Sequence, residues 1–374
     1  MKKIRIGMIG TGLIARYHAQ AIGANSDRCE IAAICDTDPE KMEAYAKDLE
    51  LGEIARYTDY HRLLEHEGLD MVSVCTANDS HCEITMAAAR AGIPVLCEKP
   101  LGLNAGEVRQ MADACESAGV INMTGFTYRR IPALEQIKAL IDRGELGRIY
   151  HYKGRFYADR MAAPDHPLEW RHLEERAGSG VLGDLASHIL DMALYLLEGQ
   201  SKKIRDVYAD ASIIYPVRKD PRTGEEVTVT SDDVCNIIAH FEDGTEVILE
   251  NSRYSPFEME IHISGLKGSV KYNLSRYDEF ELMLYDSPAD YFKTFRTVPV
   301  AAPREKGKPA PADRMARQYR YMAECIREGR TAHPTIRETI YIQELLDVMK
   351  KSYKEQRKIN LEAAEPETEG TRCM

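Results

Sequence analysis

The 374-residue chain lacks the patterns that would place it in several large protein classes. Its nine cysteines form no Cys-x-x-Cys pair, which argues against a zinc knuckle or a thioredoxin-like site and favours reduced thiols in a reducing compartment. The net charge is −11 and Lys and Arg form no cluster, so we expect no nucleic-acid partner. No apolar run suits a bilayer span and residues 1–6 start no signal peptide, so we expect no membrane association and a cytoplasmic location.

Metal-ligand spacing is also missing. The candidate ligands are His166, Glu169, His172 and His188, but none forms a His-x-x-x-His or His-Glu-x-x-His pair on one helix. His166 and His172 fall in a loop that contains Pro and Arg. We therefore predict that the protein has no metal site.

The segment 1–126 alternates strand and helix signals. Strands that are apolar on both faces and separated by helices are typical of a parallel sheet covered on both sides, which predicts a doubly wound Rossmann domain. Strands are expected at 4–9, 30–35, 56–57, 71–76, 94–97 and 120–126, and helices from the Gly-rich turn through 24 and at 39–49, 60–66, 81–91 and 104–118.

The alternation of strands and helices ends at residue 126, and after it strands follow one another with few helices between them. Short turns such as Asp243-Gly244 indicate a large, mostly antiparallel open sheet within a second α/β domain at 127–362. We expect polar loops at 218–226 and 286–312 and a disordered tail at 363–374. The expected strands are 149–158, 203–215, 233–242, 245–254, 258–264, 268–274 and 280–285, and the helices 132–143, 182–197, 313–328 and 336–355.

A cofactor cradle is predicted at the first turn. Gly10-x-Gly12-x-x-Ala15 follows a strand and opens a helix, the setting in which two glycines let a pyrophosphate approach a helix N-terminus. Asp36 ends the second strand, where its carboxylate would bind the ribose diol and repel a 2′-phosphate. The sequence therefore favours NAD over NADP. The alternative is a strand-to-helix turn that needs its glycines only for the backbone conformation and binds no dinucleotide.

Three polar residues form the candidate reactive group. Lys99 follows a strand at the carboxyl edge of the predicted sheet, where it could stabilise alkoxide charge, or it could be a surface residue paired with Glu98. Asp184 and His188 stand at i and i+4, so a regular helix would project both from one face and let the carboxylate orient a general-base imidazole. A capping Asp and a core His would show the same spacing.

These motifs together resemble the Gfo/Idh/MocA family of NAD(P)-dependent oxidoreductases over nearly the whole chain. The resemblance continues from the Gly-rich turn through Thr76-Ala77-Asn78-Asp79-Ser80-His81, where Ala77 stands in place of the family's Pro, and Glu98-Lys99-Pro100, the family hallmark. It ends with Gly125-Phe126-Thr127-Tyr128-Arg129-Arg130, Gly144-Glu145-Leu146-Gly147, Trp170-Arg171 and the stretch from Gly178 to Asp191.

The resemblance implies a role for each matching residue. Lys99 and His188 would be catalytic, with Asp184 as the partner of the histidine. Cofactor contacts are expected from Gly10, Gly12, Leu13, Ile14, Asp36, Thr76, Asn78, His81, Glu98, Lys99 and Arg171, and substrate contacts from Lys99, Arg129, Tyr157, Trp170, Asp184 and His188. The second domain would form subunit contacts through its sheet, which implies a homo-oligomer, either a dimer or a tetramer.

The expected reaction transfers hydride between nicotinamide and a secondary hydroxyl of a sugar, cyclitol or glycoside, with C3 of a glucoside as one candidate position. Polar and aromatic residues in the loop 157–172 suit a polyhydroxylated ring. Two alternatives stay open. One is a glycoside-cleaving enzyme that uses NAD for transient oxidation, and the other is a non-catalytic regulator of the same fold that senses sugars or nucleotides.

Overall fold

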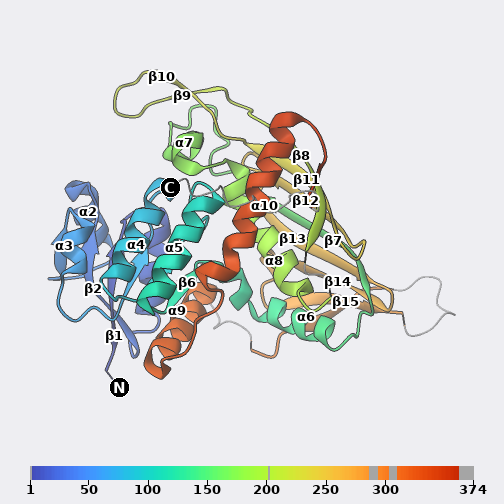
Figure 1. The fold of residues 1–374 in the computed structure, drawn as a ribbon, viewed down its shortest axis with the longest axis horizontal. Helices are drawn as coiled ribbons and strands as arrows, with labels where there is room; N and C mark the ends of the chain where they lie inside the picture. The colour runs from blue at the N-terminus through green and yellow to red at the C-terminus, as the bar shows by residue number, and fades with distance from the viewer. Residues whose placement is uncertain (1, 201–202, 286–293, 303–309, 362–374) are drawn as a thin grey trace, which may run out of the picture.

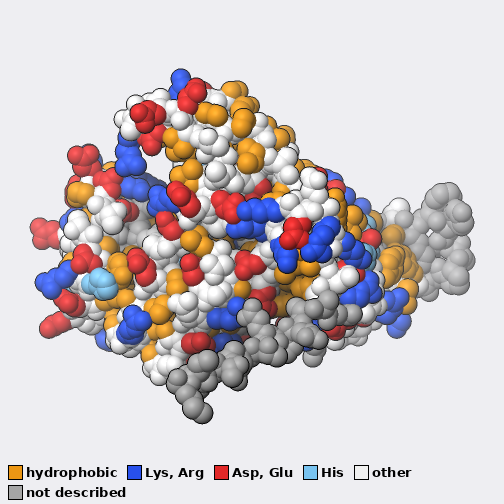
Figure 2. All heavy atoms as spheres, turned by 45° about the horizontal axis from the view of Figure 1, so that its top comes forward, with side chains coloured by type: hydrophobic (Ala, Val, Ile, Leu, Met, Phe, Trp, Pro, Cys, Tyr) orange, Lys and Arg blue, Asp and Glu red, His pale blue; other side chains and the backbone are white. Residues whose placement is uncertain are grey.

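The computed structural model describes residues 2–200, 203–285, 294–302 and 310–361, with side chains from 312 onward in the last segment. Figure 1 shows two sheets side by side, the first covered by helices α2–α5 and the second larger and wider, with α10 running between them. On the face seen in Figure 2, acidic and basic side chains are interspersed.

The first sheet is parallel throughout, with strand order β3-β2-β1-β4-β5-β6. This is the Rossmann order, in which the direction of strand addition reverses between β1 and β4 and ligands bind at the carboxyl ends there. Its strands are β1 (Ile4–Ile9), β2 (Cys29–Cys35), β3 (Ala55–Tyr57), β4 (Met71–Val74), β5 (Val95–Cys97) and β6 (Asn122–Thr124), and its helices α1 (Leu13–Gly23), α2 (Pro39–Asp48), α3 (Tyr60–Leu64), α4 (His81–Arg90) and α5 (Ala105–Ala118).

The second sheet has nine strands in the order β16-β15-β14-β13-β7-β12-β11-β8-β17. Only the β7–β12 pair is parallel within it. The strands are β7 (Ile149–Tyr157), β8 (Ile204–Ser212), β11 (Val234–Phe241), β12 (Glu246–Ser252), β13 (Glu258–Gly265), β14 (Gly268–Asn273), β15 (Glu279–Leu284), β16 (Arg296–Pro299) and β17 (Ile359–Asn360). The predicted fold class, a Rossmann sheet followed by a large antiparallel open sheet, is confirmed.

Helices cover one face of the second sheet. Apolar side chains of α6 (Pro132–Asp142), α8 (Ser187–Leu197) and α10 (Ile336–Glu355) pack on the alternating buried residues of the strands to form the largest core. Along β7, for example, Tyr152 and Phe156 face these helices. The stretch Glu174–Leu197 is apolar and long enough to cross a membrane, but most of it is buried inside the protein, as in a core helix.

Helix α9 (Ala310–Glu328) packs on the first domain, although it follows the second domain in the chain. Met315, Tyr319 and Met322 join the core that contains β1 and α1, and the buried Asn25 side chain donates to the Ala316 carbonyl. This return of the chain brings residues near position 314 to the carboxyl edge of the Rossmann sheet.

The structure differs from the expected loops in two places. The segment 218–226, predicted as a loop, includes parts of the antiparallel hairpin strands β9 (Val217–Lys219) and β10 (Glu226–Thr228). The buried Arg218 guanidinium ties this hairpin to the chain at 161–166 by donating to four backbone carbonyls there. The described part of 286–312 includes strand β16, and α9 begins at Ala310. The predicted tail at 363–374 and most of the predicted loop 286–312 lie outside the described residues.

Candidate active site

A cavity of about 180 Å³ lies where the carboxyl edge of the Rossmann sheet meets the second domain. It collects side chains from both domains and from α9. The lining residues are Ile14, Thr76, Asn78, His81, Glu98, Lys99, Pro100, Gly125, Thr127, Trp170, Arg171, Ala177, Ser179, Gly180, Asp184, Leu185, His188, Arg253, Arg314 and Met315.

The dinucleotide cradle stands at one end of this cavity. Gly10 adopts a φ of +94°, and a Cβ there would lie 2.7 Å from the backbone of Cys75, so only glycine fits. A Cβ on Gly12 would meet open space, and α1 has no side-chain cap on its first amides. Uncapped amides beside open space fit the pyrophosphate of a dinucleotide, so the residues present suit NAD.

Asp36 lies beside the same turn. One carboxylate oxygen accepts hydrogen bonds from the Thr11 amide (2.8 Å) and hydroxyl (2.7 Å), and the other accepts from the Asp38 amide. The Gly-rich turn is therefore tied to the end of β2, with a negative charge where the adenosine ribose of a bound dinucleotide would lie. Leu13 is 52% exposed at the start of α1, and Ile14 lines the cavity.

Glu98 and Lys99 leave β5 in opposite directions. The Glu98 carboxylate points into the core, where it pairs with His18 at 2.8 Å, and His18 in turn bonds Tyr319 at 2.7 Å. Burial opposes charge on both partners. Cys75 and Tyr319, and then the Glu98 hydrogen bond, outweigh it and leave the pKa of His18 well above its usual value, and the contact with His18 leaves the pKa of Glu98 below its usual value. The Glu98–His18 pair is therefore an internal ion pair with no net charge.

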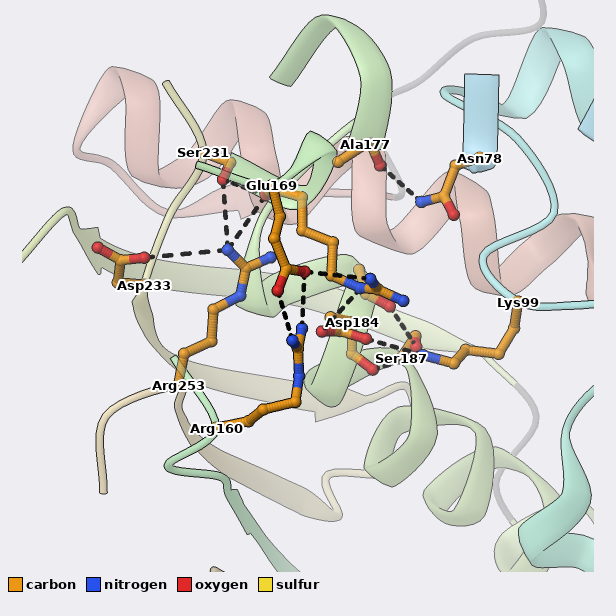
Figure 3. Close-up of polar contacts among 12 residues, drawn as sticks. Asn78, Lys99, Arg160, Glu169, Ala177, Asp184, Ser187, Ser231, Asp233 and Arg253 are labelled. Atoms are coloured by element: carbon orange, nitrogen blue, oxygen red, sulfur yellow. Dashed lines mark hydrogen bonds and ion pairs between the residues drawn. The ribbon is translucent and has the colours of Figure 1, made fainter. Parts of the chain in front are cut away.

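The Lys99 ammonium crosses to the second domain. It donates to the Asp184 carbonyl at 2.6 Å and to the Asp184 carboxylate at 3.2 Å, and Figure 3 shows the side chain reaching toward that carboxylate. The Lys99–Pro100 peptide is cis, and the Pro100 carbonyl lies 2.9 Å from the His81 ring. The Lys99 side chain is thus held by Asp184 and is only 10% exposed.

Thr76, Asn78 and His81 hold the loop that follows β4. The Asn78 amide donates to the Ala177 carbonyl of the second domain at 2.9 Å, and the Ser80 hydroxyl donates to Thr76 at 2.8 Å. Burial lowers the pKa of His81, so its ring is neutral and bonds backbone groups. Asn78 therefore ties this loop to the second domain, while Thr76 and His81 hold it within the first.

Asp184 and His188 both line the cavity, but the Asp184 carboxylate bonds Lys99 and no hydrogen bond joins it to His188 in the described chain. The helix begins with a π turn, Leu182–Ala186, and the Asp184 carboxylate lies 3.2 Å from the Lys99 ammonium and 3.8 Å from the Arg171 guanidinium. Burial would raise the pKa of Asp184, but Lys99, Arg171 and Arg253 outweigh it and hold the pKa far below the usual range. The expected carboxylate–imidazole pair is replaced by a carboxylate–ammonium pair.

His188 lies among aromatic rings, 4.6 Å from Tyr128 and 5.8 Å from Phe156 by ring centroids. Its Nδ1 is buried and has no hydrogen-bond partner within the described parts of the chain. Burial, together with Lys99 and Arg314, lowers the pKa of His188 well below 6.5. The imidazole is therefore neutral at physiological pH and able to accept a proton.

A charged cluster borders the cavity on the second-domain side. Glu169 accepts two hydrogen bonds from Arg160, and Arg171 stacks on Trp170 with 4.3 Å between guanidinium and ring. Figure 3 shows Arg160, Glu169 and Arg253 converging beside Asp184. Burial is opposed by the nearby cations, Arg160 foremost, so the pKa of Glu169 is lowered to about 2.

Two expected substrate residues lie elsewhere. Arg129 makes a paired contact with the buried carboxylate of Asp191, at 2.6 Å and 3.0 Å, and does not line the cavity. Strand alternation places Tyr157 on the open face of the sheet beside Arg155, away from the helix-covered side. The sequence therefore misplaced both, because it gave neither the buried partner of Arg129 nor the facing of β7.

Sequence reasoning also missed Arg253 and Arg314. Arg253 follows β12 and is 2% exposed, and Arg314 comes from α9. No local pattern marks either residue, since each reaches the cavity only through the folding of distant segments. Within the described chain, no three His, Cys, Asp or Glu side chains gather as metal ligands.

Comparison with known proteins identifies the family. Residues 4–126 match the model of the oxidoreductase family with an NAD-binding Rossmann fold, and residues 134–271 match the GFO/IDH/MocA C-terminal domain. Levoglucosan dehydrogenase of Pseudarthrobacter phenanthrenivorans is 31% identical over 319 residues, which cover 80% of each chain. Myo-inositol 2-dehydrogenase of Thermotoga maritima is 29% identical over 71% of this chain and 74% of that protein.

A solved structure of levoglucosan dehydrogenase in complex with NADH and L-sorbose superposes with a TM-score of 0.88 at 27% identity, over 96% of this chain and 99% of that one. The likeness thus covers both domains and the cavity between them. The chain belongs to the Gfo/Idh/MocA family and is an NAD-binding oxidoreductase.

Proposed function

We propose that the protein oxidises a secondary hydroxyl of a sugar or cyclitol with NAD, in the cavity that Lys99, Asp184 and His188 share. The observation that carries this proposal is the placement of a buried, hydrogen-bonded ammonium and a neutral, buried imidazole around one cavity at the carboxyl edge of the Rossmann sheet. The curated relatives with similar sequences are named as dehydrogenases of levoglucosan and of inositol, which supports a polyol substrate.

Each residue then has a defined task. His188 accepts the hydroxyl proton, since its lowered pKa keeps the base form populated, and a positioned base contributes roughly 10²–10⁴-fold. Lys99 donates a hydrogen bond to the oxygen as negative charge develops there. Asp184 fixes the position of the Lys99 ammonium and stabilises its positive charge, because the Asp184 carbonyl and carboxylate both accept hydrogen bonds from Nζ. When bound, NAD supplies the acceptor for the hydride.

The cradle supports NAD as the cofactor. Gly10, Gly12, Leu13 and Ile14 would hold the pyrophosphate end, while Thr76, Asn78, His81, Glu98 and Arg171 would border the nicotinamide half. Asp36 keeps a carboxylate near the expected ribose position and would repel a 2′-phosphate. Trp170 offers a ring face for stacking on a sugar, beside Arg171.

A substrate panel tests the proposal. The full-length protein is mixed with NAD and with neutral and charged sugars, cyclitols and glycosides, and NADH absorbance and released aglycone are both recorded. We expect net NADH formation with at least one polyol, and a ketone at one ring carbon by NMR. Released aglycone without net NADH would point instead to glycoside cleavage, and no NADH with any compound would contradict the proposal.

The open face of the second sheet suits a subunit contact between copies of the chain. Tyr208 of β8 and Ile238 of β11 are directly paired, and both remain about 40% exposed or more. We propose a homo-oligomer, a dimer or a tetramer, that forms through this face in the cytoplasm. Light scattering should give a multiple of the chain mass for the wild type, and Ile238→Asp with Tyr208→Asp should yield the monomer.

A further inference from the structure

The cavity carries a surplus of positive charge that the proposed chemistry leaves unexplained. Four cationic side chains line it, Lys99, Arg171, Arg253 and Arg314, against two acidic ones. One of the two, Glu98, is already paired with His18 inside the core. Asp184 contacts Lys99 and Arg171, and just outside the lining Glu169 lies 3.5 Å from Arg171 and Asp233 lies 3.9 Å from Arg253. Arg314 is therefore the lining cation that has no carboxylate within 4 Å among the described residues.

Arg314 is the cation whose charge is least balanced. Its Nε donates to the Thr127 hydroxyl at 3.2 Å, and its guanidinium lies 4.5 Å from the Tyr128 ring. Its Nη1 is buried and has no hydrogen-bond partner among the described residues. The adjacent Asp313 carboxylate accepts from Tyr277 at 2.9 Å and from Arg317 at 2.8 Å, so it does not serve Arg314.

Arg253 reinforces the same imbalance from another wall of the cavity. It is 2% exposed, its Nε and Nη2 lack partners in the described structure, and its closest carboxylate, Asp233, lies 3.9 Å away. Figure 3 shows this guanidinium beside Ser231 and Asp233. A buried donor without an acceptor is unfavourable, so the buried Nη1 of the half-buried Arg314 and the buried guanidinium of Arg253 both leave a place for an acceptor that a ligand brings.

The cofactor does not account for Arg314. The pyrophosphate belongs at the α1 N-terminus, where Gly10 and Gly12 shape the turn. Arg314 instead lies beside Thr127 and 4.5 Å from the Tyr128 ring, and that ring lies 4.6 Å from the ring of His188, the proposed base. Its free donor is therefore available at the end of the cavity where the reacting alcohol would bind.

We infer that the substrate of the proposed reaction is a sugar bearing an oxyanion group, a carboxylate or a phosphate, and that Arg314 binds this group. The inference rests on the proposed function. A guanidinium can hold a carboxylate or a phosphate through two parallel hydrogen bonds, and such charge-assisted bonds are stronger than those to a neutral hydroxyl. Arg253 adds favourable potential from another part of the lining.

Matched sugars test the inference on the full-length protein with NAD. Neutral hexoses are compared with their uronates and their 6-phosphates, and kcat/KM is measured for each. We expect an anionic member to exceed its neutral parent, and the choice between uronate and phosphate identifies the group. A higher kcat/KM for every neutral parent would overturn the inference while leaving the proposed oxidation intact, whereas no NADH from any sugar would overturn both.

Variants of Arg314 locate the effect. Arg314→Met should lower the ratio of kcat/KM between the anionic and the neutral sugar roughly tenfold to a hundredfold, the value of a charge-assisted hydrogen bond, and Arg314→Lys should restore part of it. Arg320→Met, on the exposed side of the same helix, is the matched control and should keep the wild-type ratio. NADH binding checks folding. An equal change for both sugars in Arg314→Met would show that Arg314 acts only through His188 and would refute substrate binding.

Discussion

Replacing Lys99 with Met removes the one cation that contacts both the carbonyl and the carboxylate of Asp184. Because the ammonium is 10% exposed and fixed at 2.6 Å and 3.2 Å, it is in place before the oxygen becomes charged. Loss of such a donor typically lowers kcat by roughly 10²–10³-fold, or about 2.7–4 kcal/mol of transition-state stabilisation. We expect Lys99→Met to lower kcat by this factor while NADH binding stays close to that of the wild type.

The assay is steady-state NADH formation with the best polyol from the panel, and NADH affinity is followed by fluorescence. Lys138→Met is the matched control, because Lys138 is also mostly buried (15% exposed) and ion-paired, with Asp142 and Glu198, but does not line the cavity. This control should turn over like the wild type. A Lys99→Met enzyme with wild-type kcat, or a Lys138→Met enzyme with an equal loss, would refute the reasoning.

Three further predictions concern pH and stability. The acidic limb of the pH profile of kcat/KM should lie below pH 6.5, because burial and nearby cations lower the pKa of His188 and keep its imidazole unprotonated. His188→Ala should remove that limb, and an acidic limb above pH 6.5 would contradict this. At neutral pH the free energy of unfolding of Glu169→Gln should be about 2 kcal/mol below that of the wild type. Because the lowered pKa of Glu169 stabilises the folded state only while the carboxylate is ionised, urea titrations should show this difference shrinking as the pH falls from 4.5 toward 2. A difference that does not change with pH would argue against this reasoning. Asp191→Ala should lose about 3–5 kcal/mol by leaving Arg129 buried without its partner, and Arg129→Met with Asp191→Leu should recover most of it in the same titration; an equally unstable double variant would rule out the ion-pair explanation.

Much of the fold is predictable because its signals are local. The first strand was expected at 4–9 and β1 is Ile4–Ile9, since an apolar run followed by a Gly-rich turn determines both ends. The strand expected at 120–126 is shorter, because Val120 closes the preceding helix by donating to Cys115 and Phe126 begins a tight turn by donating to Thr124. Boundaries thus depend on hydrogen bonds that composition does not show.

The site was harder to predict than the fold. Residues that follow parallel strands, such as Asp36 and Lys99, could be placed because the carboxyl ends of those strands share one edge. The pairing of Asp184 with His188 was inferred from their spacing alone, but the carboxylate bonds Lys99 of the first domain, a partner that spacing along one helix does not reveal. Arg253 and Arg314 could not be foreseen, because each enters the cavity from a segment distant in sequence.

The most direct measurement of the central claim is single-turnover transfer of deuterium from a polyol labelled at its carbinol carbons to NAD. If Lys99 and His188 act on an alcohol beside the nicotinamide, the reduced cofactor of the wild type should carry one deuterium, and Lys99→Met should transfer it roughly 10²–10³-fold more slowly. Reduced cofactor without deuterium, or transfer at the wild-type rate in the variant, would contradict the account.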